Sequence, residues 1–285
     1  MKVINHEFVQ LDNVRLHIAY AGPQSGPLII FLHGFPENWY EWHKQLVYFS
    51  KKGYFAIALD QRGYNLSSKP KYKQDYRIDV LAADVIKIAN HFKRNKFYLV
   101  GHDWGANVSW WTALRYPHRI EKLVIVNVPH PIIMKKLIST LPRQIFKSWY
   151  IFFLQIPLLS DFFVSFNKGI FLSSMVTSSA NKGAFTSNRL SFYRQTWNKE
   201  NVHSMITWYR GMGLGSDSKL SSIKVKPPCL ILWGLKDKFI VKDSIKPSLK
   251  LCTNGQTLLF PNNTHWLVIE KPQKVSQRIM SFIEN

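Results

Sequence analysis

Residues 97–105 of the chain read FYLVGHDWG, and this stretch decides the expected fold. The first four residues predict a buried strand, and Gly101 and Gly105 are small enough to let a following helix lie close to it. In the better-known form of this strand–turn–helix, a serine nucleophile stands between the two glycines on a strained bend. Asp103 takes that position here. The sequence therefore predicts a nucleophilic carboxylate above a parallel sheet.

An aspartate at this turn indicates a particular chemistry. A carboxylate that displaces oxygen or halide from saturated carbon forms an alkyl ester, which water can still cleave at the carboxyl carbon. A serine would form an ether, which water leaves intact. The turn alone also fits a second interpretation, in which Asp103 stabilises the N-terminus of a helix. The rest of the chain has to decide between them.

Composition favours one large α/β domain, or such a domain with an inserted lid. The chain has 285 residues, of which 46% are hydrophobic. Its two cysteines, Cys229 and Cys252, suggest neither a disulfide framework nor a metal site. Polar residues within positions 1–7 interrupt the continuous apolar stretch that a secretory signal needs, so we expect a cytoplasmic protein. The sequence shows no phosphate-binding glycine loop, metal cluster or redox pair, and we expect no cofactor and no metal.

The formal net charge of +21 raises the question of an anionic partner. The lysines are dispersed in short groups without a run of five or more, and no nucleic-acid-binding motif accompanies them. The sequence alone therefore favours a solvated basic surface and no nucleic-acid partner.

Short apolar runs alternate with amphipathic stretches, which is typical of a mostly parallel sheet covered by helices on both faces. Strands are expected at 28–32, 54–59, 97–100, 123–128, 229–233 and 257–260, after an antiparallel hairpin at 3–9 and 14–20. The alternation stops after residue 129, where aromatic residues become frequent. We expect a core formed by residues 1–130 and 217–285 and a helical cap formed by residues 131–216.

The most apolar part of the cap, residues 145–166, resembles a membrane span at first sight. Lys147, Gln155, Pro157 and Asp161 interrupt it well before the ~20 apolar residues that a span requires. We expect cap helices over a substrate cavity and no membrane span.

Two segments supply the other parts of a catalytic site. Residues 33–36, HGFP, follow the first expected parallel strand, where Phe35 N–H would join Trp104 N–H as an oxyanion donor. His265 follows the last expected strand and would serve as the base. Asp237 follows the strand at 229–233 and would hold that histidine.

Two other residues were candidates for the acid that holds the histidine. Asp243 is the alternative to Asp237, although a helix-cap role suits it better. Asn127, which follows the apolar run at 123–126, cannot carry the charge.

Four motifs in this order resemble the epoxide hydrolase branch of the α/β-hydrolase superfamily. They are HGFPE at 33–37, DQRGY at 60–64, HDWG at 102–105 and NVPHP at 127–131, and the resemblance covers essentially the whole chain. It implies an α/β-hydrolase fold with a helical cap. It also implies that Asp103 opens an epoxide, that His265 and Asp237 drive hydrolysis of the resulting ester to a vicinal diol, and that two cap tyrosines donate hydrogen bonds to the epoxide oxygen.

The resemblance places those tyrosines by motif. Residues 148–157, SWYIFFLQIP, give Tyr150, and residues 205–210, MITWYR, give Tyr209, with Tyr193 as the competitor. The implied partners are water and a small apolar or aromatic epoxide, bound by a monomer or a homodimer. The expected substrate pocket is lined by His33, Pro36, Trp149, Phe153, Trp208 and Trp266.

Related enzymes with an aspartate nucleophile leave an alternative open. Haloacetate dehalogenases have arginines where this chain has Trp104 and Asn107, and haloalkane dehalogenases commonly have Asn in place of Phe35. Both comparisons favour an epoxide and keep dehalogenation as the alternative. A non-catalytic receptor for a small ligand is a further alternative, because a fold alone does not determine function.

Overall fold

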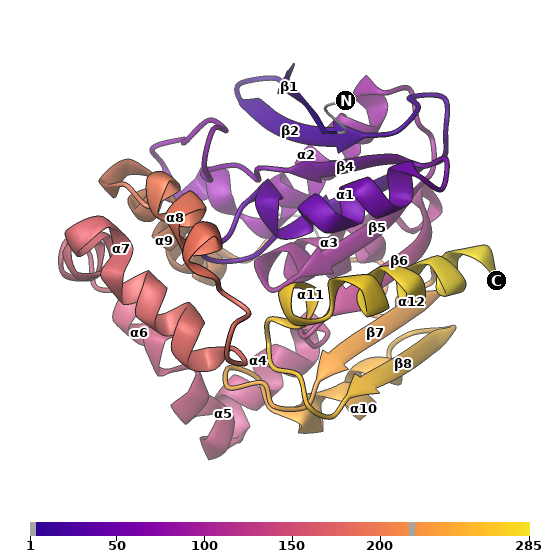
Figure 1. The fold of residues 1–285 in the computed structure, drawn as a ribbon. Helices are drawn as coiled ribbons and strands as arrows, with labels where there is room; N and C mark the ends of the chain where they lie inside the picture. Colours follow the sequence, from indigo (N-terminus) through magenta and orange to yellow (C-terminus); the bar gives the residue numbers. More distant parts are fainter. Residues whose placement is uncertain (1–3, 217–219) are drawn as a thin grey trace.

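The computed structural model describes residues 4–216 and 220–285, and within these ranges eight strands form one sheet in the order β1-β2-β4-β3-β5-β6-β7-β8 (Figure 1). β1 (Asn5–Gln10) and β2 (Arg15–Ala21) form the expected hairpin, and β2 also pairs antiparallel with β4. All other pairs in the sheet are parallel. The predicted mostly parallel sheet is thus confirmed. Residue 3, the expected start of the hairpin, lies outside the described residues.

The six parallel strands fall on the six predicted apolar runs. Their bounds are β3 Leu28–Leu32, β4 Phe55–Leu59, β5 Phe97–His102, β6 Ile120–Val126, β7 Cys229–Gly234 and β8 Gly255–Phe260. Every residue of β3, β4 and β7 is buried, because helices cover both faces of the sheet. This burial explains why these segments are continuously apolar rather than alternating.

Two helical layers cover the sheet. α1 (His43–Ser50) and α12 (Pro272–Glu284) pack on the face that carries Ile29 and Phe31. α2 (Ile78–His91), α3 (Trp104–Arg115) and α10 (Ile245–Leu249) pack on the face that carries Ile30 and Leu32. The short helices are η1 Trp39–Trp42, η2 Lys73–Tyr76, η3 Pro117–Arg119, η5 Lys242–Ser244 and α11 Leu267–Glu270.

A group of helices stands between β6 and β7, where the cap was expected, and lies to one side of the sheet (Figure 1). Its members are α4 Pro131–Thr140, α5 Pro142–Lys147, α6 Trp149–Leu154, α7 Leu159–Ser179, α8 Ser187–Thr196, α9 Lys199–Gly211 and η4 Met212–Leu214. We call these helices the cap. The expected return to the core at residue 217 lies outside the described residues.

The apolar stretch at 145–166 is divided among three helices, since α5, α6 and α7 each begin or end within it. Among the helices that the structure describes, none is long and apolar enough to cross a membrane.

Candidate active site

Asp103 lies on the sharp turn between β5 and α3. Its backbone adopts φ +48° and ψ −123°, a conformation that residues with a side chain rarely adopt. The turn is crowded, because a Cβ atom on Gly105 would lie 2.2 Å from the carbonyl oxygen of Leu32. Glycine at this position therefore lets α3 start directly against β3. The bend holds the Asp103 side chain at the carboxyl end of the sheet.

The loop after β3 binds one oxygen of the Asp103 carboxylate. The Phe35 N–H donates a hydrogen bond to Asp103 Oδ1 over 2.7 Å. A Cβ atom on Gly34 would lie 2.2 Å from the Asp103 Cβ, so only glycine permits this approach. Trp104 is the first residue of α3, and its N–H is outside the helical hydrogen-bond pattern. The two expected oxyanion residues thus lie on either side of Asp103.

His265 lies between two carboxylates. Its Nδ1 is 2.8 Å from Asp237 Oδ2, and its Nε2 is 3.4 Å from Asp103 Oδ2. The three predicted residues come together from the ends of β5, β7 and β8, in the order nucleophile, acid, base along the chain. Asp243, the alternative acid, is exposed in η5.

Asp237 is fixed by several donors. The backbone N–H groups of Phe239 and Ile240 donate to its Oδ1 over 2.7 and 2.9 Å. The Asn127 side-chain amide donates to its Oδ2 over 2.8 Å. Asn127 cannot replace the acid, as the sequence indicated, but its amide orients the acid. This positioning role was missed because sequence shows the amide and not its direction.

The charges of Asp103, Asp237 and His265 stabilise one another. Burial alone would raise the pKa of Asp103 and of Asp237, but the hydrogen bond and charge of His265 lower both below the usual value. Burial alone would lower the pKa of His265, but the negative charge of Asp237 and the bonds to both carboxylates raise it to about 10. At pH 7 the site therefore holds an imidazolium between two carboxylates.

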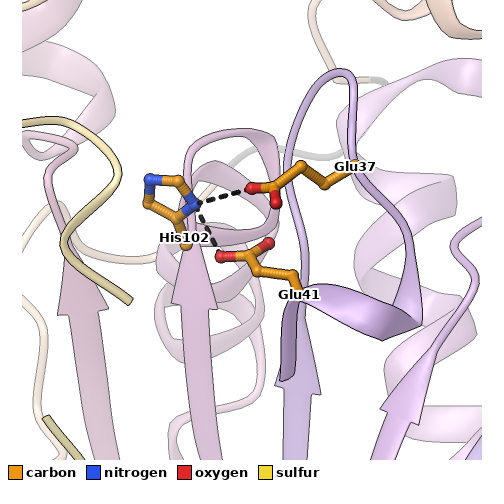
Figure 2. A group of neighbouring side chains, drawn as sticks. All are labelled: Glu37, Glu41 and His102. Atoms are coloured by element: carbon orange, nitrogen blue, oxygen red, sulfur yellow. Dashed lines mark ion pairs between the residues drawn. The ribbon is translucent and has the colours of Figure 1, made fainter. Parts of the chain in front are cut away.

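A second buried group lies directly behind the turn. Figure 2 shows Glu37, Glu41 and His102 pointing toward one another, with the His102 Nδ1 atom 2.7 Å from Glu41 Oε1 and 3.9 Å from Glu37 Oε2. All three residues are at most 2% exposed. The Tyr193 hydroxyl donates to Glu37 Oε1 over 2.6 Å. Sequence analysis did not find this group, since Glu41 belongs to none of the recognised motifs.

The protons of this group follow from its hydrogen bonds. The His102 Nε2 lies 2.9 Å from the carbonyl oxygen of His265, so Nε2 carries a proton and donates it. Burial lowers the pKa of His102 to about 4 and raises that of Glu37 to about 8. Burial likewise raises the pKa of Glu41 well above its usual value. The imidazole is therefore neutral and Glu41 is protonated. Their 2.7 Å contact lacks the angles of a regular hydrogen bond, so His102 Nδ1 and Glu41 Oε1 have no hydrogen-bond partner among the described residues.

Two carboxyls and one imidazole also have the composition of a small metal site, and their ligand atoms lie within 4.8 Å of one another. Because burial keeps both carboxyls protonated and the imidazole neutral, the three side chains lie together without net charge.

The two expected cap tyrosines approach the site from different helices. Tyr150 on α6 and Tyr209 on α9 have ring centroids 6.0 Å apart. The Tyr209 ring lies edge-on to Phe35 and Trp104, with centroids at 5.3 and 5.1 Å. Burial raises the pKa of both tyrosines, and the charge of Asp103 raises it further. Both phenols therefore remain protonated and can donate a hydrogen bond.

Tyr193, the competitor of Tyr209, has another partner. Its hydroxyl donates to Glu37, and its ring stacks on Trp197 with centroids 5.9 Å apart. Tyr193 is fully buried behind the Asp103 turn. Tyr209, which lies against both oxyanion residues, is the better placed of the two.

The structure brings part of the expected pocket together. The Trp208 ring lies 5.6 Å from that of Trp104, and the Trp266 ring lies 5.4 Å from that of His265. The carbonyl oxygen of Pro36 accepts a hydrogen bond from the Trp197 indole over 2.7 Å, and Phe153 is half-buried beside Phe163.

Two of the expected pocket residues are placed elsewhere. Both ring nitrogens of His33 contact backbone atoms, those of Gln61 and Gly34, so this residue holds the oxyanion loop. Trp149 is 58% exposed and is not brought into the site. In its place Phe239 lies between Tyr150 and His265, with ring centroids at 5.9 and 5.1 Å. The expected strand ended before residue 239, and nothing in the sequence marked this phenylalanine.

Comparisons with known proteins agree with this geometry. A family model for the alpha/beta hydrolase fold matches residues 27–164. An AB hydrolase superfamily protein of Bacillus subtilis is 37% identical over the whole of both chains. Mouse epoxide hydrolase 4 is 34% identical, over 98% of this chain and 79% of the mouse protein.

Solved structures show the same likeness. The crystal structure of Bacillus megaterium epoxide hydrolase in complex with an inhibitor superposes with a TM-score of 0.90 at 29% identity, covering 98% of this chain and all of the other. Identity above 30% over nearly the full length, together with the shared fold, establishes the relationship. The chain belongs to the epoxide hydrolase family of enzymes within the α/β-hydrolase superfamily.

Proposed function

We propose that the protein hydrolyses an apolar or aromatic epoxide to a vicinal diol through a covalent ester on Asp103. The observation that carries this proposal is the position of Asp103 Oδ2. Its partner oxygen is held by Phe35 N–H, while Oδ2 lies 3.4 Å from His265. The Tyr209 ring packs against Phe35 and Trp104, the two residues next to Asp103, and Tyr150 lies 6.0 Å from Tyr209. The relatives named epoxide hydrolases support the same reaction.

The first step opens the ring. Asp103 Oδ2 forms a bond to one epoxide carbon as the bond from that carbon to oxygen breaks. The leaving oxygen is strongly basic, and it accepts hydrogen bonds from Tyr150 and Tyr209 and takes a proton from one of them. The His265 imidazolium returns that proton to the tyrosine through water. The products of the step are an uncharged ester on Asp103 and a neutral His265.

The second step cleaves the ester. Esterification removes the negative charge 3.4 Å from His265 Nε2 and thereby lowers the pKa of the imidazole, which can now accept a proton from water. The hydroxide adds to the carboxyl carbon of Asp103. The oxygen that becomes negative is the one that Phe35 N–H binds, and the N–H of Trp104, outside the helical hydrogen-bond pattern, is the proposed second donor. Each such donor contributes about 3 kcal/mol. Collapse of this intermediate releases the diol and restores the Asp103 carboxylate and the His265 imidazolium.

The substrate class follows from the residues around Asp103. Phe35, Trp104, Tyr209 and Trp208 present ring edges and faces to one another above the turn. A site walled by aromatic rings with two hydroxyl donors suits an apolar molecule that carries one reactive oxygen. The aromatic composition supports an apolar or aromatic epoxide.

Intact-mass analysis with styrene oxide tests the proposal. His265→Gln should react with one equivalent and keep the mass of the epoxide, because ring opening proceeds while ester hydrolysis fails. Adding Asp103→Asn should abolish the adduct. Asp243→Asn, which removes an exposed carboxylate from η5, is the matched control and should retain it.

The same panel separates the alternatives. An adduct that survives Asp103→Asn would overturn the nucleophile assignment. Wild-type protein that releases halide from 1-chlorobutane and forms no diol from styrene oxide would move the assignment to a dehalogenase. If the wild-type protein bound styrene oxide but formed neither an adduct nor a diol, the result would support the non-catalytic receptor.

A further inference from the structure

The longest cap helix exposes a stripe of large apolar side chains. On α7, Leu159, Phe162, Phe163, Phe166 and Ile170 are 45%, 60%, 51%, 56% and 50% exposed. Their spacing of three, four, seven and eleven residues from Leu159 places them on one face of the helix. An amphipathic helix normally turns such a face toward the core. Here that face points toward solvent.

The neighbouring cap helices extend the stripe. Phe153 connects the two helices, since its ring centroid lies 6.3 Å from that of Trp149 on α6 and 6.4 Å from that of Phe163 on α7. Figure 1 shows α5, α6 and α7 at the periphery of the molecule. We define the cap apolar face by its ten most exposed members, which are Phe146, Trp149, Phe152, Ile156, Leu158, Leu159, Phe162, Phe163, Phe166 and Ile170.

This concentration is unusual for a surface. More than half of the exposed large hydrophobic side chains among the described residues lie between positions 145 and 170. Single exposed apolar residues are ordinary, but a contiguous patch of this kind marks a surface that another apolar surface covers. The cap apolar face is therefore an interaction surface.

The charge around the face determines which partner fits it. Residues 131–199 contain nine Lys and Arg residues and a single acidic residue, Asp161. Asp161 pairs with Arg210 over 2.5 Å and with His203 over 2.7 Å, so its charge is balanced locally. Lys135, Lys136 and Arg143 are exposed on α4 and α5, and α5 packs against both α4 and α6. The surroundings of the cap apolar face are thus strongly positive.

A second copy of the chain and a lipid surface would respond oppositely to this charge. A second copy brings the same basic residues and a net charge of +21, which opposes association. An anionic bilayer attracts the lysines and arginines to its phosphates and accepts aromatic side chains at the boundary of headgroups and acyl chains. The combination of apolar face and basic surroundings favours the lipid.

We propose that the cap apolar face docks on an anionic lipid bilayer, with its aromatic side chains inserted at the headgroup boundary and Lys135, Lys136 and Arg143 against lipid phosphates. The protein lies on the bilayer and does not span it. α6 carries both Trp149 of this face and the proposed donor Tyr150, so the docked surface adjoins the site. If the proposed function holds, an apolar epoxide dissolved in the bilayer lies next to the cap.

Vesicle flotation tests the docking without any substrate. Wild-type protein should float with vesicles of phosphatidylcholine and phosphatidylglycerol at 7:3 and much less with pure phosphatidylcholine. Phe162→Ser/Phe166→Ser/Ile170→Ser should weaken binding at least about tenfold, since three large apolar anchors are lost. Lys135→Glu/Lys136→Glu/Arg143→Glu should weaken binding to the anionic vesicles alone. Binding should also fall as NaCl rises from 0.05 to 0.5 M.

A matched control removes exposed apolar residues elsewhere. Leu66→Ser/Tyr72→Ser/Ile223→Ser replaces side chains that are 55%, 66% and 49% exposed outside the cap apolar face, and it should bind vesicles as the wild type does. Unchanged thermal unfolding and unchanged hydrolysis of a water-soluble epoxide would show that the variants are folded. Neither readout depends on lipid, so failure of catalysis and failure of docking remain distinguishable.

Three outcomes would overturn the proposal. Wild-type protein that does not float with anionic vesicles, or a serine variant that floats as well as the wild type, would exclude the lipid surface. A dimer by light scattering that the serine substitutions convert to a monomer, without vesicle binding by either, would assign the face to a second copy of the chain.

Discussion

The Nδ1 atom of His102 lies 2.7 Å from Glu41 Oε1, directly behind the turn that carries Asp103. Because His102 uses Nε2–H to bind the carbonyl oxygen of His265, its Nδ1 carries no hydrogen, and any proton in this contact belongs to the Glu41 carboxyl, whose pKa burial raises. Glu41 Oε2 accepts a hydrogen bond from Gly34 N–H over 3.3 Å. Glu41 thus connects the oxyanion loop with the nucleophile turn, and His102 connects that turn with the loop of the base.

Replacement of Glu41 tests its protonation. Glu41→Gln keeps an oxygen for Gly34 N–H and supplies an amide donor to His102 Nδ1, so the free energy of unfolding should change by less than about 1 kcal/mol. Glu41→Leu leaves both partners buried without a hydrogen bond and should cost about 2 to 4 kcal/mol. Urea denaturation at pH 7 measures both. Equal losses in the two variants would mean that the native carboxyl is ionised.

Asn127 should matter for the second chemical step. Asn127→Leu removes the amide that donates to Asp237 Oδ2, so the acid holds His265 less firmly. We expect ester hydrolysis to slow by roughly tenfold, the scale found for groups that orient a catalytic side chain. Single-turnover kinetics with styrene oxide separates this step from ring opening. A slower ring opening with unchanged ester hydrolysis would contradict the assignment.

The cap tyrosines should act on the first step. In a His265→Gln background, Tyr150→Phe combined with Tyr209→Phe should prevent ester formation, because the leaving oxygen then lacks its proton donors. Tyr193→Phe should still form the ester and lose about 1 kcal/mol of stability through its missing bond to Glu37. Intact-mass analysis detects the ester. If only the Tyr193→Phe variant failed to form the ester, Tyr193 would be the donor.

Deprotonation of His265 should lower the free energy of unfolding as the pH rises. Its pKa is about 10 in the folded protein and near 6.5 in the unfolded chain, so the folded state holds one more proton between these values. This contribution is complete below pH 6.5 and is lost as the pH rises through 10. The stability difference between wild type and His265→Gln should therefore shrink from pH 7 to 10. Urea denaturation of both proteins at four pH values measures this difference. A difference that stays constant with pH would contradict the ion pair of His265 with Asp103 and Asp237.

Much of the fold could be predicted because its signals are local. Continuous apolar runs gave the six parallel strands, and the crowding at Gly34 and Gly105 explains why small residues accompany Asp103. The proposed catalytic residues follow strand ends, so chain order alone predicted that Asp237 and His265 lie near the turn. These predictions needed no knowledge of side-chain direction.

The remaining features depend on the direction in which side chains point and on contacts between segments that are distant in the sequence. Trp149 shares a helix with Tyr150, and only the helix orientation shows that it faces outward. The Glu41–His102 contact joins residues 61 positions apart, and Phe239 comes to lie against His265 through the path of the loop after β7. Sequence periodicity carries no information on such pairings.

The proposed nucleophile, acid and base all lie on loops that follow strands of the sheet, whereas the two hydroxyl donors come from cap helices. In the proposed mechanism, ring opening therefore requires both the sheet domain and the cap. Hydrolysis of the ester, which regenerates the free enzyme, requires the sheet domain alone. Changes in the cap can alter which epoxides are accepted without impairing turnover of an ester already formed. The two halves of the catalytic cycle are thus open to separate adaptation.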